Sequence, residues 1–234
     1  MNTETPPGTF REKQLKYTRV REAYSSKEKT VIKTLSDRTI SRDSLRIYLR
    51  AFKTEKKVEV WGKNISDSTY TLIKEIPICE ISGEIGPKRR SQDLQVPEGF
   101  YQIAVFNPYS SYHLSLGINY PNASDKIIGK GNLGGDIMIH GSCVTIGCIP
   151  LTDTYIKEVY ILAVEAKHSG QTAIPVHIFP TRLNEKGMQF LQDEFEGKTE
   201  LLNFWKNLQP GFLFFENNKK LPKITIDKEG KYHT

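Results

Sequence analysis

Short stretches of the chain alternate hydrophobic and polar residues or carry runs of valine, isoleucine and aromatic residues, a pattern typical of β-strands. Residues that favour turns separate these stretches. The predicted strands cover residues 46–52, 57–61, 70–76, 100–106, 113–120, 137–139 and 174–179. The first three predict neighbouring strands of one antiparallel sheet, so we expect a β core in the middle of the chain.

Apolar residues at helical spacing flank this core. Residues 10–36 are charged, with apolar positions at loosely helical intervals, and predict one or two leading helices. Thr152 and Asp153 are good N-cap residues at the start of a second helical pattern, and residues 184–207 carry a third. The tail at 212–226 predicts short strand-like pieces. The predicted fold class is therefore mainly β with flanking helices (α+β).

The pattern divides the chain into three parts. They are an N-terminal helical extension at 1–45, a core domain at 46–182, and a C-terminal α/β extension at 183–234 packed on that core. A chain of 234 residues is long enough for such an arrangement. Residues 83–99 form a loop by composition, which we expect to line a cleft, and glycines at 129–135 permit close backbone approach.

The composition, 38% hydrophobic and 26% charged, fits a soluble globular protein. No apolar run approaches the roughly 18–20 residues of a membrane-spanning helix, and residues 1–7 lack the apolar region of a signal peptide. We expect a cytosolic protein or one whose leader has been removed. The net charge of +6 is spread along the chain, which favours a solvated surface or an acidic polymer over nucleic acid. Nucleotide-binding glycine motifs are missing.

A histidine and a cysteine, His140 and Cys148, lie close together between an apolar strand and the helix start, each beside a glycine. A thiol becomes reactive when a nearby imidazole and local dipoles stabilise its thiolate. The N–H groups of Gly147 and Cys148 can face a carbonyl oxygen of a substrate. The segment therefore predicts a nucleophile with its base.

The three cysteines do not resemble a disulfide framework, and at least one must be free. Cys79 falls in an apolar strand and is expected to pack there. Cys143 is expected either to be buried or to form a reversible disulfide with Cys148. His140, Cys143 and Cys148 are also zinc-ligand types, but their spacing fits no familiar structural zinc pair, so we prefer a thiol site without metal.

The segment Ile-His-Gly at 139–141, followed by Thr-Ile-Gly-Cys-Ile at 145–149, resembles the catalytic motif of the L,D-transpeptidase (YkuD) family. Other segments are similar to its YafK-like branch, whose members include the enzyme that detaches Braun's lipoprotein from peptidoglycan. These segments are 97–101, 106–122, 143–148 and 174–180. Two positions depart from the motif, since Ile146 stands where histidine is common and Pro150 where arginine or asparagine is common.

The resemblance implies a YkuD-type β-sandwich core with Cys148 as nucleophile and His140 as general base. The carbonyl of Gly141 would orient the imidazole, and the amides of Gly147 and Cys148 would hold the oxyanion. No cofactor is expected. For His113, one of the candidate substrate contacts, the alternative is a structural role. Candidate substrate contacts are Thr145, His113, Ser142 and Tyr112.

The implied activity is that of a cysteine-dependent peptidoglycan amidase or peptidase. It would cleave, through an acyl-enzyme, the bond between a meso-diaminopimelate stem peptide and a covalently attached lipoprotein. The expected partners are peptidoglycan and an outer-membrane lipoprotein linked to it, and the expected location is the periplasm, with the leader absent from this sequence. One alternative is a transpeptidase that forms 3-3 cross-links or attaches protein. Another is an inactive peptidoglycan-binding module.

Overall fold

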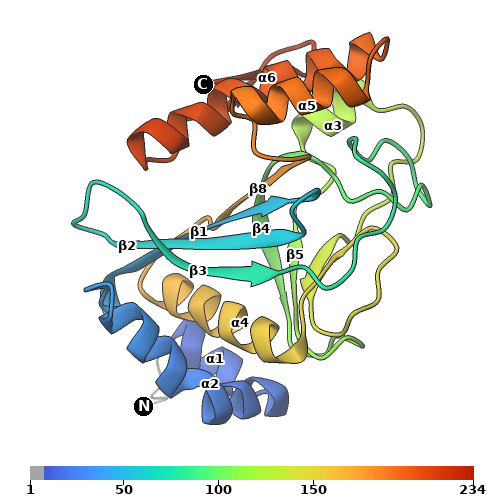
Figure 1. The fold of residues 1–234 in the computed structure, drawn as a ribbon. Coiled ribbons are helices and arrows are strands. Elements are labelled where there is room, and N and C mark those ends of the chain that lie inside the picture. The colour runs from blue at the N-terminus through green and yellow to red at the C-terminus, as the bar shows by residue number, and fades with distance from the viewer. Residues whose placement is uncertain (1–7) are drawn as a thin grey trace, which may run out of the picture.

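A computed structural model describes residues 8–234 and shows a curled sheet with helices on both sides (Figure 1). Residues 1–7, on which the expectation about a leader rests, lie outside the described residues. The helices are α1 (Phe10–Leu15), α2 (Thr18–Ser36), the 3-10 helix η1 (Arg42–Ser44), α3 (Ala123–Ile128), α4 (Asp153–His168), α5 (Glu185–Glu194) and α6 (Thr199–Asn218). The strands are β1 (Leu45–Phe52), β2 (Lys57–Asn64), β3 (Thr71–Pro77), β4 (Gly99–Asn107), β5 (Ser115–Ile118), β6 (Met138–His140), β7 (Ile149–Pro150), β8 (Pro175–Phe179), β9 (Thr225–Ile226) and β10 (Tyr232–His233).

Eight strands of the described chain form one sheet in the order β3-β2-β1-β8-β4-β5-β6-β7. The predicted antiparallel neighbours are confirmed, because β2 pairs antiparallel with both β1 and β3. β8 joins the two halves of the sheet, pairing parallel with β1 and antiparallel with β4. At the far edge β5 pairs antiparallel with β6, and β6 pairs parallel with β7.

The predicted leading helices are confirmed as α1 and α2, which lie with α4 against one face of the sheet (Figure 1). Val20 of α2, Leu49 of β1 and Val159 of α4 are fully buried in this layer. Glu165 of α4 accepts a hydrogen bond from the hydroxyl of Tyr24 at 2.7 Å and is paired with arginines from both ends of the helical extension. Burial of an ionised carboxylate requires such partners, so these contacts fix the extension to the core.

On the other face, α5 and α6 cover an aromatic core that contains Phe52, Phe179, Trp205 and Phe212. The strand-like pieces predicted at 212–226 are wrong as far as Asn218, because α6 continues through Pro210 to that residue. Packing explains the difference, since this last part of the helix buries Phe212 and Phe215 completely. Only β9 and β10 are strands in the tail, and they form a separate ribbon.

The predicted α+β class, a β core with flanking helices, is confirmed. Helix α3, which begins at Ala123, was not predicted from the sequence pattern. The boundaries drawn at 45/46 and 182/183 stay predictions. Within residues 8–234, no helix combines the length and apolar character needed to cross a bilayer.

Candidate active site

The pairing of strands β6 and β7 brings the two candidate catalytic residues close together. Ile139 lies opposite Ile149, and His140 lies opposite Pro150. Both isoleucines are 1% exposed and point into the core. Because side chains alternate along a strand, His140 lies on the opposite face of β6 from Ile139. Cys148 immediately precedes β7, and its sulfur lies beside the backbone N–H of Met138, two positions before His140 in β6.

His140 is buried and held in one orientation. Its Nδ1 lies 2.5 Å from the carbonyl oxygen of Gly141, and because that oxygen can only accept, Nδ1 carries the proton and Nε2 is left as the basic nitrogen. The ring of Tyr112 covers the imidazole, with 4.7 Å between the ring centres. Burial lowers the pKa of His140 below 6.5, although the hydrogen bond to Gly141 acts in the opposite direction. The imidazole is therefore neutral at pH 7.

Cys148 is the free cysteine of the described chain. Its sulfur accepts a hydrogen bond from the N–H of Met138 at 3.4 Å and donates to the carbonyl oxygen of Asp136 at 3.7 Å. Burial raises the pKa of the Cys148 thiol above 9.0, while Met138 N–H and the ammonium of Lys88 act in the opposite direction. In this conformation the sulfur is a neutral thiol that faces the β6 backbone.

A glycine is required beside the histidine. A Cβ atom at Gly141 would lie 2.5 Å from Oδ1 of Asp153 and 2.9 Å from the carbonyl oxygen of Tyr112. The same Oδ1 atom accepts a hydrogen bond from the N–H of Ser142, whose φ of +64° is in the left-handed region. Asp153 at the start of α4 thus fixes the turn that follows His140. From the sequence, Asp153 was predicted only as a helix cap, and its carboxylate at the helix start was the available signal for this second role.

The turn before the thiol is closed by Thr145. Its hydroxyl donates to the carbonyl oxygen of Cys148 at 2.8 Å and accepts from the N–H of Gly147 at 3.1 Å. Gly147 has a φ of +135°, which side chains rarely adopt. In this structure, then, the Thr145 hydroxyl shapes the loop, and an oxyanion bound at Gly147 N–H would compete with it.

The loop at 83–99 lies against this turn. A Cβ at Gly147 would be 3.1 Å from the carbonyl oxygen of Gln95. Within the loop, Asp93 pairs with the ammonium of Lys88 at 2.5 Å and accepts the backbone N–H groups of Arg89 and Arg90, both at 3.0 Å. The loop that was expected to line a cleft is therefore an ordered neighbour of the candidate nucleophile. Its own sequence gave no sign of which glycine it would contact.

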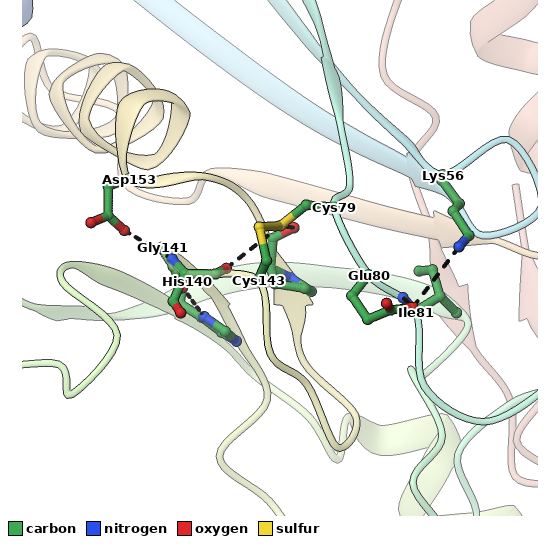
Figure 2. The surroundings of a disulfide bond; sticks show 10 residues. Lys56, Cys79, Glu80, Ile81, His140, Gly141, Cys143 and Asp153 are labelled. Atoms are coloured by element: carbon green, nitrogen blue, oxygen red, sulfur yellow. Dashed lines mark hydrogen bonds and ion pairs between the residues drawn. A yellow bond between two sulfur atoms is a disulfide. The ribbon is translucent and has the colours of Figure 1, made fainter.

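The expectations for Cys79 and Cys143 are wrong. The two are joined in a disulfide, with Cα atoms 5.5 Å apart, instead of Cys79 packing in a strand or Cys143 pairing with Cys148 (Figure 2). The N–H of Cys79 also donates to the carbonyl oxygen of Pro150 in β7 at 3.1 Å. The segment after edge strand β3 thus reaches the opposite edge strand of the curled sheet. The alternative zinc site loses a ligand, because the Cys143 sulfur is already bonded.

Two other predicted residues occupy the connection between β4 and β5. Tyr112 lies on His140, as described above, and is 46% exposed. His113 has a φ of +72°, and its carbonyl oxygen accepts from Arg19 at 2.8 Å. Burial lowers the pKa of His113, and the charge of Asp153 acts in the opposite direction. The structure therefore brings Tyr112 to His140 and places His113 near Asp153.

His177 is a buried core residue. Its Nδ1 lies 2.7 Å from the hydroxyl of Tyr48, and burial lowers its pKa to about 3. It belongs to β8, in the middle of the sheet, and takes no part in the arrangement around Cys148.

Comparisons with known proteins show the family of the chain. A family model described as the L,D-transpeptidase catalytic domain (YkuD) matches residues 46–178. YafK of Escherichia coli strain K12, a protein named as an L,D-transpeptidase, is 33% identical over 188 residues, which cover 80% of this chain and 72% of YafK. The homologue in strain O157:H7 matches equally.

Solved structures are more distant. The helical cell shape determining protein Pgp2 of Campylobacter jejuni is 21% identical, with a TM-score of 0.48, over 80% of this chain and 74% of that one. Bd1075 of Bdellovibrio bacteriovorus is 22% identical, with a TM-score of 0.42, over 66% of this chain and 56% of that one. At these scores neither structure supports a functional argument.

Proposed function

The chain belongs to the L,D-transpeptidase (YkuD) family, an enzyme class that acts on peptidoglycan, and from this premise we propose that it is a cysteine hydrolase that releases a covalently attached lipoprotein from the stem peptide. One observation carries the proposal. A buried imidazole with its proton fixed on Nδ1 belongs to β6, the strand whose Met138 N–H donates a hydrogen bond to the free thiol of the described chain.

In the first step, the side chain of Cys148 turns from the β6 backbone toward Nε2 of His140, which takes the thiol proton. The thiolate attacks the carbonyl carbon of the amide between meso-diaminopimelate and a lysine side chain of the protein. A C–S bond forms, and the carbonyl π electrons move to oxygen, which the N–H groups of Gly147 and Cys148 stabilise once the Gly147 N–H leaves the Thr145 hydroxyl. When the intermediate collapses, the C–N bond breaks, and His140 gives its proton to the leaving amine.

Water then resolves the acyl-enzyme. His140 removes a proton from the water as its oxygen attacks the thioester carbonyl, and the C–S bond breaks to regenerate the thiol. If an amine of a second stem peptide attacked instead, the product would be a cross-link. The YafK-like segments favour release of protein, and the 33% identity to YafK extends this similarity over 80% of the chain.

The disulfide supports a location outside the cytoplasm. Disulfides persist in oxidising compartments such as the periplasm and are rare in cytosolic proteins of mesophiles. Cys79 and Cys143 are paired in this structure. We therefore propose that the enzyme works in the periplasm, where peptidoglycan and its attached proteins are accessible.

The test uses lipoprotein-bearing sacculi and soluble muropeptides rich in tetrapeptides, with products followed by mass spectrometry. We expect the wild-type protein to release lipoprotein, and the Cys148→Ala and His140→Gln variants to lose at least about 10³-fold in rate, because both steps need the pair. His233→Gln, at an exposed histidine of β10, is the matched control and should retain the activity.

Other products would change the assignment. Dimers with 3-3 cross-links that depend on Cys148 would make the protein a transpeptidase. Binding to sacculi with no product from either substrate would instead support the inactive module.

A further inference from the structure

The loop that carries the candidate nucleophile presents apolar side chains to solvent. Val144 is 52% exposed and Ile146 is 78% exposed. Thr145, between them, turns inward and bonds to the backbone at Cys148. The two apolar residues therefore point outward from either side of a fixed threonine, and Ile146 is two positions from the thiol.

Two more exposed apolar residues come from loops that touch this segment. Leu94, 48% exposed, precedes Gln95, whose carbonyl oxygen lies against Gly147. Tyr112, 46% exposed, covers His140. We call these four residues, Leu94, Tyr112, Val144 and Ile146, the apolar rim. They come from three different stretches of chain, which either carry Cys148, contact its loop at Gly147 or cover His140.

The rim is held in place rather than mobile. Leu94 has a φ of +60°, and the neighbouring Asp93 fixes this turn by accepting the N–H groups of Arg89, Arg90 and Gln95. The disulfide at Cys143 fixes the chain immediately before Val144. A fixed apolar surface loses little conformational entropy when a partner covers it, so its burial contributes fully to binding.

We propose that the apolar rim binds the polypeptide side of the scissile amide, through apolar side chains next to the linking lysine. The inference rests on the proposed function and specifies its substrate. A stem peptide offers carboxylates, amines and single methyl groups, and glycan offers hydroxyls, so neither provides the large apolar groups that would cover Ile146 and Val144. A polypeptide can do so. A lipid surface is disfavoured, because acyl chains seated on the rim would obstruct access of the carbonyl to Cys148.

Three synthetic conjugates test the proposal, each with a diaminopimelate-containing stem amide-linked to a lysine side chain. In the first, the lysine belongs to a short leucine-rich peptide. In the second it belongs to a peptide of equal length with serine and asparagine in place of leucine, and in the third it is a single blocked lysine. Affinity is measured with the Cys148→Ala variant by fluorescence anisotropy, and kcat/KM with the active enzyme by chromatography.

We expect the leucine-rich conjugate to be preferred over the equally long polar one by about tenfold, both in affinity and in kcat/KM, since burial of one or two aliphatic side chains supplies that factor. Ile146→Asn should reduce this preference to about twofold or less. Ile65→Asn is the matched control, because Ile65 is 61% exposed after β2, outside the rim, and the preference should persist there.

The possible outcomes distinguish peptide binding by the apolar rim from hydrolysis at Cys148. Preference in affinity without turnover of any conjugate would overturn the proposed hydrolysis and leave the rim supported. Equal affinity for all three conjugates would overturn the proposed role of the rim. Equal loss of the preference for the leucine-rich conjugate in Ile146→Asn and Ile65→Asn would also overturn it. Ile146-dependent sedimentation with vesicles of phosphatidylethanolamine and phosphatidylglycerol, without preference among the conjugates, would overturn it in favour of a lipid surface.

Discussion

The imidazole of His140 and the thiol of Cys148 have environments that shift their pKa values in opposite directions. Burial lowers the pKa of His140 and raises the pKa of Cys148. The pair therefore rests as neutral imidazole and neutral thiol, unlike cysteine enzymes that keep a thiolate and imidazolium at rest. The resting thiol should be poorly reactive toward general alkylating agents, and attack should depend on substrate and on rotation of Cys148.

The pH dependence of kcat/KM follows from these directions. The acid limb reports protonation of His140 and should lie below 6.5, because its pKa is lowered. The alkaline limb reports deprotonation of Cys148 and should lie above 9.0, because the pKa of this thiol is raised. Once the thiol has lost its proton to solvent, His140 has no proton to pass to the departing amine. A profile measured on a soluble conjugate between these limits should be flat.

Alkylation of Cys148 by iodoacetamide provides an independent measurement, since the other two cysteines are bonded to each other. Its rate should rise with a midpoint above 9.0. An acid limb at or above 6.5, or thiol alkylation with a midpoint near neutrality, would contradict the neutral-pair description.

Among the elements, the loop at 83–99 depends on a buried ion pair at its base. The ammonium of Lys53 lies 2.9 Å from the carboxylate of Glu98, and both side chains are almost fully buried. Glu98 also accepts from the N–H of Gly86 at 2.8 Å and from the indole of Trp205 in α6 at 2.7 Å. The C-terminal helix therefore contributes to the loop that contacts the candidate site.

Removal of one partner of this ion pair should be costly. Lys53→Met leaves the Glu98 carboxylate buried without its cation, so we expect a loss of about 3–5 kcal/mol in the free energy of unfolding, measured by urea denaturation. Lys57→Met is the matched control, because its pair with Glu75 is 36% and 41% exposed and should contribute only about 0–1 kcal/mol. Equal urea midpoints for the two variants would refute this account.

Most elements could be predicted from local pattern, and the failures have a common cause. Alternation identified β1, β2 and β3 because each buries residues in a regular sheet. Residues 212–218 were predicted incorrectly because Phe212 and Phe215 are buried by tertiary packing on a helix that a central proline does not end. The motif identified His140 and Cys148, whereas the role of Asp153 depends on where α4 begins relative to Ser142.

At the scale of the whole molecule, the sheet curls until the segment after edge strand β3 reaches edge strand β7. β3 and β7 are the edge strands, and the disulfide and a backbone hydrogen bond from Cys79 to Pro150 connect their ends. No local pattern in the sequence could show this pairing, because the two cysteines are 64 residues apart and become neighbours only when the sheet curls. The motif loop is thereby tied to both edges.

Loss of this cross-link should lower global stability. The double variant Cys79→Ser/Cys143→Ser should lose about 2–5 kcal/mol in the free energy of unfolding, because the unfolded chain is no longer constrained by a long covalent loop. Dithiothreitol should lower the urea midpoint of the wild-type protein to that of the double variant and leave the variant unchanged. Cys148→Ala is the control and should keep its sensitivity to the reductant. A reductant effect on the double variant would point to some other cause.

The same cross-link means that the protein must mature with two of its sulfurs joined and the third free. Cys143 is five residues from Cys148 but 64 from its partner, so the first collisions in an unfolded chain favour the wrong pair, which closes the shorter loop. That pair would consume the candidate nucleophile. Only a sheet that has already curled brings Cys79 near enough to compete, and thiol exchange at Cys143 can then release Cys148. Completion of the fold thus decides which sulfur stays available for chemistry, and a chain oxidised too early would be inactive until it is reshuffled.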